Sequence, residues 1–314
     1  MRELPPRLKQ FHEELSRSIP CIPTTADARR ELETKPLRDL LAIYINWQSR
    51  FIPPRPRIVQ VVPDFWNSPL VKRHTGRLRV LIRKIEAGDD LSMHLSNRAH
   101  THGYVSSKQR RIWSDDRDFT LNGWEVQHVH LDEMNKQGRR PHTLDRELLY
   151  AVFGAEEATL VLVGDHNSFD DGTLDDALVR ARAVSGGFEL VGIHPGTSTA
   201  RERVSLARRA INSAAGIDGK TIISSVLSAS GTAVRTRVQA DEVFEVLYHL
   251  DPQLESSEFA LSLAEGWRPP KEPVFEWKMV CCALVLTERK SGVGLPLVND
   301  PRGLAMSDMA LLGE

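Results

Sequence analysis

The segment WEVQHVHL at residues 124–131 carries two histidines in a pattern of alternating residue types. The alternation predicts a β-strand that presents His128 and His130 on the same face. Unperturbed imidazoles titrate near pH about 6.5, so two of them side by side can serve as a general base and a general acid close to neutral pH. The alternative is that both are structural polar groups, satisfied by hydrogen bonds at the edge of a sheet.

Two following segments also have the composition of strands. They are RELLYAVFG at 146–154 and ATLVLVGDH at 158–166, separated by the short turn Gly154–Glu157. If the three strands form an antiparallel meander, the first and third run in the same direction, and their C-terminal ends share one edge with the start of the second. His166 and Arg146 then lie at the same edge as the histidine pair. Strand ends two strands apart are roughly 10 Å from each other, a span that fits a phosphodiester.

This set of residue types matches the needs of RNA cleavage without a metal ion. The reaction requires a base for the 2′-hydroxyl, an acid for the departing 5′-oxygen and a cation for the charge that builds on the phosphoryl oxygens. Arginine suits the last role because its planar guanidinium matches phosphate oxygens, and the 2′-hydroxyl restricts the reaction to RNA. We predict three histidines in acid–base roles, with no assignment among them, one arginine that stabilises the transition state, and no cofactor. The predicted catalytic residues are His128, His130, His166 and Arg146.

Basic side chains near this edge are candidates for holding the RNA backbone. One group lies in the polar loop 132–145, and another in the segment 68–91, whose apolar spacing predicts a helix with a basic face. A basic run is typical either of a solvated helix face or of a surface that follows phosphates. The predicted substrate-binding residues are Lys136, Arg139 and Arg140 in the loop, and Arg77, Arg79 and Arg83 in the helix.

Two other functions are compatible with the same segment. HVHLDE matches the HxHxDH pattern of metallo-β-lactamase-like hydrolases at His128, His130 and Asp132, but Glu133 replaces the last histidine of that pattern. Histidines with carboxylates suit zinc or manganese, so these three residues would be the ligands of a metal-dependent hydrolase. The second alternative is a nucleic-acid-binding or regulatory protein without enzymatic activity, in which the histidines are structural.

The spacing of apolar residues predicts the elements that must position these side chains. Helices are expected at 5–19, 37–51, 68–91, 173–185, 200–213 and 239–250, and a β-rich stretch at 273–288. The predicted class is α+β, with N-terminal helices packed on a central antiparallel β-meander, followed by a second small α+β region. The expected domains are an N-terminal helical region (1–65), a central ribonuclease-like domain (66–186) and a C-terminal domain of unassigned role (187–314).

The composition of the chain indicates a soluble protein with no strong bulk charge. Its 314 residues are 41% hydrophobic and 26% charged, and the formal net charge is −1. Cys21, Cys281 and Cys282 make a poor disulfide framework, which favours a reducing compartment. The N-terminus lacks the apolar core of a secretory signal, and no stretch reaches the roughly 20 apolar residues that span a bilayer. We therefore predict a cytoplasmic protein without a membrane partner; the pattern leaves the oligomeric state open.

Residues 118–166 resemble a group of bacterial proteins that carry a DFxLNxWxxHHxHL-like segment, then an arginine, an LLxAxV-like strand and a later strand ending in histidine. The matching residues are DFTLNGWEVQHVHL, Arg146 with ELLYAVF, and LVLVGDH, while Gln127 stands where the pattern has its first histidine. The order of helices and meander is similar to the fold of barnase-type and RelE-type ribonuclease toxins. This resemblance covers about a sixth of the chain. It implies RNA cleavage without a metal, in a toxin–antitoxin or phage-defence setting, with RNA and a cognate antitoxin or inhibitor as partners.

Overall fold

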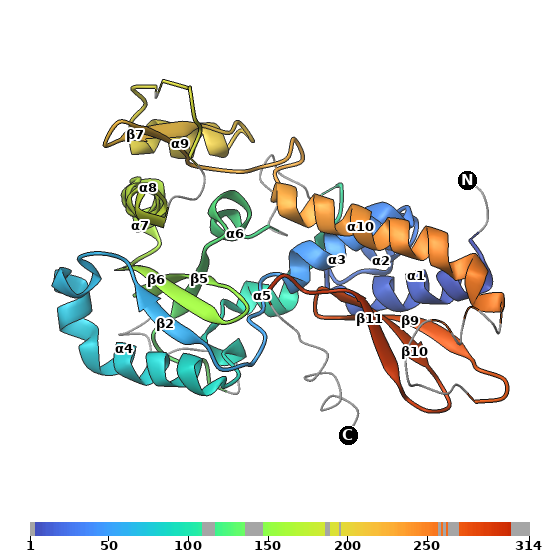
Figure 1. The fold of residues 1–314 in the computed structure, drawn as a ribbon. Coiled ribbons are helices and arrows are strands. Elements are labelled where there is room, and N and C mark those ends of the chain that lie inside the picture. The colour runs from blue at the N-terminus through green and yellow to red at the C-terminus, as the bar shows by residue number, and fades with distance from the viewer. Residues whose placement is uncertain are drawn as a thin grey trace. The chain divides into compact units, whose positions relative to one another are not determined.

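The computed structural model describes residues 4–108, 117–135, 147–185, 189–194, 196–256 and 270–302, together with Phe259 and Ser262. Helices and several separate sheets confirm the predicted α+β class (Figure 1). The chain divides into two compact units, each assembled from separate stretches of sequence. The first unit comprises 1–49, 101–110 and 235–314, and the second comprises 50–100 and 111–234. The two ends of the chain, predicted in different regions, therefore belong to the same unit.

The first unit packs N-terminal helices against C-terminal elements. These are α1 (Pro6–Ser18), α2 (Ala26–Glu33), α3 (Leu37–Gln48), α10 (Val234–Leu250), η3 (Asp251–Glu255), β9 (Phe275–Val280), β10 (Ala283–Glu288) and β11 (Gly294–Val298), with the short parallel pair β1 (Cys21–Ile22) and β3 (Tyr104–Val105). Phe11 and Leu15 of α1 share one core with Leu247 of α10 and Trp277 of β9. The N-terminal helices thus bury their apolar stripe against α10 and the C-terminal sheet instead of the meander on which they were expected.

The second unit is built on a four-stranded sheet in the order β2 (Ile58–Val61), β6 (Glu157–Gly164), β5 (Leu148–Phe153) and β4 (Gln127–His130). The last three strands form the antiparallel meander that the sequence predicts. β2 adds to β6 in parallel, a pairing that the prolines before it conceal in the sequence. β2, β4 and β6 therefore run in the same direction, and their C-terminal ends lie at one end of the sheet.

Helices cover both faces of this sheet (Figure 1). α4 covers one face, where Leu78 and Leu81 pack with Val129 of β4 and Leu149 of β5. α6, α7 and α8 lie over the opposite face, which carries Leu148 and Tyr150 of β5. The remaining elements of the unit are η1 (Phe65–Asn67), α4 (Pro69–Ala87), η2 (Ser92–His94), α5 (Asn97–Thr101), α6 (Phe119–Trp124), α7 (Asn167–Asp170), α8 (Thr173–Ser185), α9 (Ala200–Ala207), β7 (Ala214–Ile217) and β8 (Lys220–Ile223).

The strand that contains the histidine pair is shorter than the alternating pattern predicts. Trp124 does not belong to the strand but ends helix α6, and Glu125 closes that helix in the left-handed conformation with φ 60°. The Glu125 N–H donates to the carbonyl of Leu121 at 2.9 Å. The strand begins only at Gln127, so the alternation spans a helix end and a strand. The predicted strand 124–131 is therefore wrong in its first half, because local hydrogen bonds close a helical turn there.

A buried carboxylate ties the helices on the histidine face together. Asp175 of α8 is 1% exposed and accepts hydrogen bonds from the indole N–H of Trp124 at 2.9 Å and from Nε of Arg203 at 2.7 Å. The hydroxyl of Ser224 donates to the same carboxylate. Arg203, which belongs to α9, is itself 5% exposed. These contacts join α6, α8, α9 and the segment after β8 through one ion that has no access to water.

Removal of this carboxylate is expected to destabilise the second unit strongly. Asp175→Ala leaves the Arg203 guanidinium buried without its main counter-ion, so the free energy of unfolding should fall by about 3–5 kcal/mol. Urea denaturation followed by circular dichroism measures the change.

The neighbouring Asp176 provides a matched control. Its carboxylate also contacts Arg203, at 3.0 Å, but its side chain is 54% exposed. Asp176→Ala should therefore cost less than about 1 kcal/mol. Equal losses in the two variants would contradict the central role of the buried carboxylate.

Candidate active site

The two histidines of β4 lie on the sheet face that carries α6 and α7. His130 pairs across the sheet with Leu148, and Leu148 pairs with Gly164, while His128 pairs with Tyr150 in the adjacent row. Directly opposed residues of antiparallel strands point to the same side. Both imidazoles therefore stand over the C-terminal half of the meander. His130 is 6% exposed, and the side chain of His128 is 18% exposed.

His166 reaches this pair from the turn that follows β6. Its ring centroid lies 6.1 Å from that of His128 and 6.0 Å from that of His130. This separation is shorter than the span between strand ends, because the chain folds back over the sheet after Gly164. The structure thus brings the three histidines of the sequence prediction together in one cluster.

Glycine is required where the chain folds back. A Cβ atom on Gly164 would lie 2.3 Å from Oγ of Ser168 and 3.0 Å from Cβ of Ser168. Asp165 then caps α7, with its Oδ1 accepting the N–H of Asn167 at 2.8 Å and that of Ser168 at 3.1 Å. A short, capped turn on a glycine therefore sets the position of His166.

Asp118 orients the imidazole of His128. Its Oδ2 lies 3.4 Å from Nδ1 of His128, and Oγ1 of Thr120 lies 3.2 Å from the same nitrogen. The other oxygen of Asp118 accepts the Thr120 hydroxyl at 2.8 Å and the N–H of Leu121 at 3.1 Å, as the N-cap of α6. A carboxylate beside Nδ1 favours the tautomer that carries its proton there and leaves Nε2 as the basic nitrogen.

The carbonyl of His130 receives a hydrogen bond from a further histidine at the end of β4. Nδ1 of His94 donates to this carbonyl at 2.9 Å, and Nε2 of His94 lies 3.4 Å from Glu133. Lys84 of α4 hydrogen-bonds the same carboxylate and holds the pKa of Glu133 below its ordinary value. The end of β4 is therefore anchored to helix α4 and to η2.

A pocket of about 470 Å³ opens beside His128 and His166. Among the described residues, its lining includes Arg50, Arg98 and Arg117, which come from three separate segments, and one acidic residue, Asp118. Arginine guanidinium groups bind phosphate oxygens through paired N–H donors. The pocket thus combines two imidazoles with an excess of positive charge in a space large enough for one nucleotide unit.

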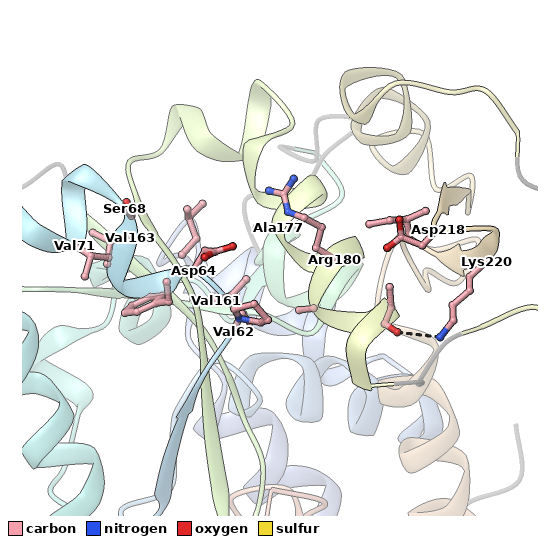
Figure 2. A pocket seen from close by; sticks show the side chains of 16 residues that line it. Val62, Asp64, Ser68, Val71, Val161, Val163, Ala177, Arg180, Asp218 and Lys220 are labelled. Carbon is pink, nitrogen blue, oxygen red and sulfur yellow. Dashed lines mark hydrogen bonds between the residues drawn. The ribbon is translucent and has the colours of Figure 1, made fainter.

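A larger cavity of about 610 Å³ lies between the end of β2, helix α8 and the β7–β8 hairpin (Figure 2). Valines form much of its wall, while Asp218 and Lys220 lie on the hairpin side and Arg180 comes from α8. The Lys220 ammonium donates to the carbonyl of Ala183 at 3.3 Å. The described lining contains neither a histidine nor a cysteine, and its ionisable groups are carboxylates, an arginine and a lysine. The smaller pocket is the one whose described lining contains imidazoles.

The predicted basic residues are not all near the histidines. Helix α4 covers the opposite face of the sheet, so Arg79 and Arg83 are exposed on the far side from His128. Arg77 pairs with the carboxylate of Asp132 and lies 3.8 Å from Glu147. The remaining predicted residues lie outside the described residues; they are Lys136, Arg139, Arg140 and Arg146.

The ligand set of the metal alternative is not assembled. The Asp132 side chain pairs with Arg77 of α4, which covers the face opposite to His128 and His130. Within the described ranges, no three histidine, cysteine or acidic side chains are placed to hold one metal ion.

Sequence reasoning missed the residues that surround the histidines. Asp118 had a usable signal, because an aspartate ahead of FTLNGW is a typical helix cap within reach of the following strand. Arg50 and Arg98 had none, since each joins the pocket only through long-range packing, whereas Arg117 directly precedes Asp118 in the sequence.

The glycine before the turn yields a stability prediction. Gly164→Ala should lower the free energy of unfolding by about 1–3 kcal/mol, because the added methyl group overlaps the Ser168 side chain. Combination with Ser168→Gly should recover part of the loss. Urea denaturation provides the measurement.

Gly123 in α6 is the matched control for this substitution. A Cβ atom there meets nothing closer than Leu227 Cδ1 at 4.0 Å. Gly123→Ala should therefore leave stability unchanged or improve it. If both alanine variants unfold at the same urea concentration, the contact between residue 164 and Ser168 does not limit stability.

Comparisons with known proteins yield no relative of this chain. No family model matches it, and neither a curated protein nor a solved structure does. In the part of the chain that the structure describes, every helix is too short or too polar to cross a membrane. The resemblance of residues 118–166 to ribonuclease-toxin-like proteins, and the cytoplasmic location, stay predictions.

Proposed function

We propose that this protein is a metal-independent endoribonuclease whose active site is the histidine cluster of the second unit. The observation that supports this proposal is the position of His166. Its ring lies about 6 Å from the rings of His128 and His130, beside a pocket that is lined by arginines. Nucleophilic cleavage of RNA needs a base and an acid on opposite sides of one phosphate, together with cations for its charge. Two imidazoles this close together can both reach one phosphate group that is bound in the adjoining pocket.

His128 is proposed as the general base. Asp118 beside Nδ1 orients the ring and stabilises the imidazolium that forms when Nε2 takes a proton. In this scheme Nε2 removes the proton of the 2′-hydroxyl, and the 2′-oxygen forms a bond to phosphorus. The bond from phosphorus to the 5′-oxygen breaks, which leaves a 2′,3′-cyclic phosphate.

His166 is proposed as the general acid. It lines the same pocket as His128, so it can deliver a proton to the departing 5′-oxygen. His130 is more deeply buried and lies 6.0 Å from His166, which suits a role in placing that ring. Arg50, Arg98 and Arg117 are proposed to bind the phosphate oxygens. The role of Arg146, which lies outside the described residues, stays a prediction from the sequence.

Incubation of the purified protein with single-stranded RNA tests the reaction. We expect cleavage that persists in EDTA, and a substrate with 2′-deoxyribose at the cleaved position should be resistant. His128→Ala and His166→Ala should each lower kcat by about 10²–10⁴-fold. His249→Ala, at an exposed histidine of the first unit, is the control and should keep full activity.

Three outcomes would overturn this assignment. Loss of cleavage in EDTA would favour the metal-dependent hydrolase. A shift of RNA without cleavage would favour a nucleic-acid-binding protein. Full activity in both histidine variants would place the chemistry elsewhere in the chain.

Two exposed arginines on helices test which surface holds the RNA backbone. Arg98 of α5 lines the pocket, whereas Arg79 of α4 lies beyond the opposite face of the sheet. Arg98→Ala should raise KM and make the dependence of log K on log salt shallower by about 0.7, because one phosphate contact of a single strand is lost. Arg79→Ala should leave both quantities unchanged. If Arg79→Ala raises KM and Arg98→Ala does not, RNA follows the basic face of α4.

A role as a toxin or phage-defence effector extends this proposal. It would require RNA cleavage to arrest growth and a cognate inhibitor to relieve it. The wild-type protein and the His128→Ala variant are expressed in parallel in bacterial cells, and growth is measured. Growth arrest by the wild type alone indicates that the activity is toxic, whereas arrest by both indicates that the folded protein is toxic without it.

A further inference from the structure

Tyr150 lies beneath the histidine cluster, in the middle strand of the meander. It is 1% exposed and pairs across the sheet with His128 on one side and Leu162 on the other. Its ring centroid is 6.4 Å from that of His128. A buried tyrosine places its hydroxyl where a hydrogen-bond partner exists, and here that partner belongs to the turn that bears His166.

The Tyr150 hydroxyl donates to the main-chain carbonyl of Asp165 at 2.8 Å. This carbonyl belongs to the peptide that links Asp165 to His166. The same residue is held from two further sides, because its N–H donates to Oγ of Ser168 at 3.0 Å and its carboxylate caps α7. The bond from Tyr150 is the one of these three that connects the turn to the sheet.

From this contact we propose that Tyr150 is a positioning residue, whose hydroxyl holds the Asp165–His166 peptide so that the imidazole of His166 faces that of His128. The two rings depend on different supports. β4 and Asp118 place His128, whereas His166 stands on a turn outside the sheet. The hydrogen bond from Tyr150 of β5 fixes that turn relative to the sheet, and it thereby sets the distance between the two rings. The catalytic consequence rests on the proposed ribonuclease function, but the positioning does not.

The hydroxyl keeps its proton over the range in which histidines titrate. Burial raises the pKa of Tyr150, and the nearby carboxylates of Asp165, Asp118 and Asp171 raise it further. Because the pKa is raised above an ordinary value that already lies well above neutrality, the phenol is a donor at every pH at which imidazole changes charge. The hydrogen bond to Asp165 is therefore constant across the activity profile.

Tyr150→Phe removes this bond and leaves the ring that packs in the core. We expect kcat to fall about 10- to 100-fold with KM unchanged, because a misplaced acid slows the chemical step while the arginines still hold the RNA. The histidine resonances in an NMR titration give a readout that needs no activity. The His166 signals should move and titrate at a different pH, whereas the His249 signals should stay.

Tyr104→Phe is the matched control. Tyr104 is also 1% exposed, and its hydroxyl also donates over 2.8 Å, to Glu31 of the first unit. Each variant loses one partly buried hydrogen bond, and Tyr104→Phe should lose at least as much stability as Tyr150→Phe because its acceptor is a carboxylate. The kcat and the His166 resonances should change only in Tyr150→Phe, which separates positioning from general destabilisation.

The proposal is overturned if Tyr150→Phe keeps both the wild-type kcat and the wild-type His166 resonances. Where Tyr150→Phe fails to fold, Ser168→Ala removes a hydrogen bond within the turn and keeps the bond from Tyr150. The His166 resonances should then stay close to those of the wild type, and their displacement in that variant overturns the proposal. If the wild-type protein does not cleave RNA, the proposed function falls. The titration of His166 then still decides whether Tyr150 positions it.

Discussion

The carboxylate of Asp175 lies in the interior of the second unit, where an uncompensated charge would be very costly. Arg203, Trp124 and Ser224 satisfy it, and these residues come from α9, α6 and the segment after β8. Arg182 of α8, the helix that contains Asp175, adds a second contact, because its guanidinium donates to the carbonyl of Trp124 at 2.9 Å. The end of α6 is thus held through both its side chain and its backbone.

The geometry of the histidine cluster depends on this attachment. α6 begins at its N-cap Asp118, which contacts Nδ1 of His128, and it ends at Trp124, which is held by α8. The helix therefore acts as a short rigid connection between the buried ion and the imidazole. α7 and α8 follow directly on the turn that bears His166, so the other side of the cluster rests on the same helical layer. Side chains held on packed elements stay within the narrow limits that acid–base catalysis requires.

The charged side chains of this protein are distributed unevenly over the second unit. The net charge is −1, yet the pocket beside His128 gathers three arginines around one aspartate. On α4, two of the basic groups lie against carboxylates, since Arg77 pairs with Asp132 and Lys84 pairs with Glu133. The larger cavity near the β7–β8 hairpin carries charges of both signs, including those of Arg180, Asp218 and Lys220.

The amino-acid sequence determined the features that depend on near neighbours along the chain. The alternation in ATLVLVG predicts a strand, a short turn closes the hairpin at Gly154, and the strand directions bring His128, His130 and His166 to one end of the sheet. Only the tertiary structure decided which distant segments join them. Residues 58–61 become a fourth strand because β6 offers an open edge, and the N-terminal helices meet a sheet more than 200 residues away because both have an apolar face to bury. Arg50 and Arg98 reach the pocket for the same reason: packing of the whole unit places them, and no local pattern records that packing.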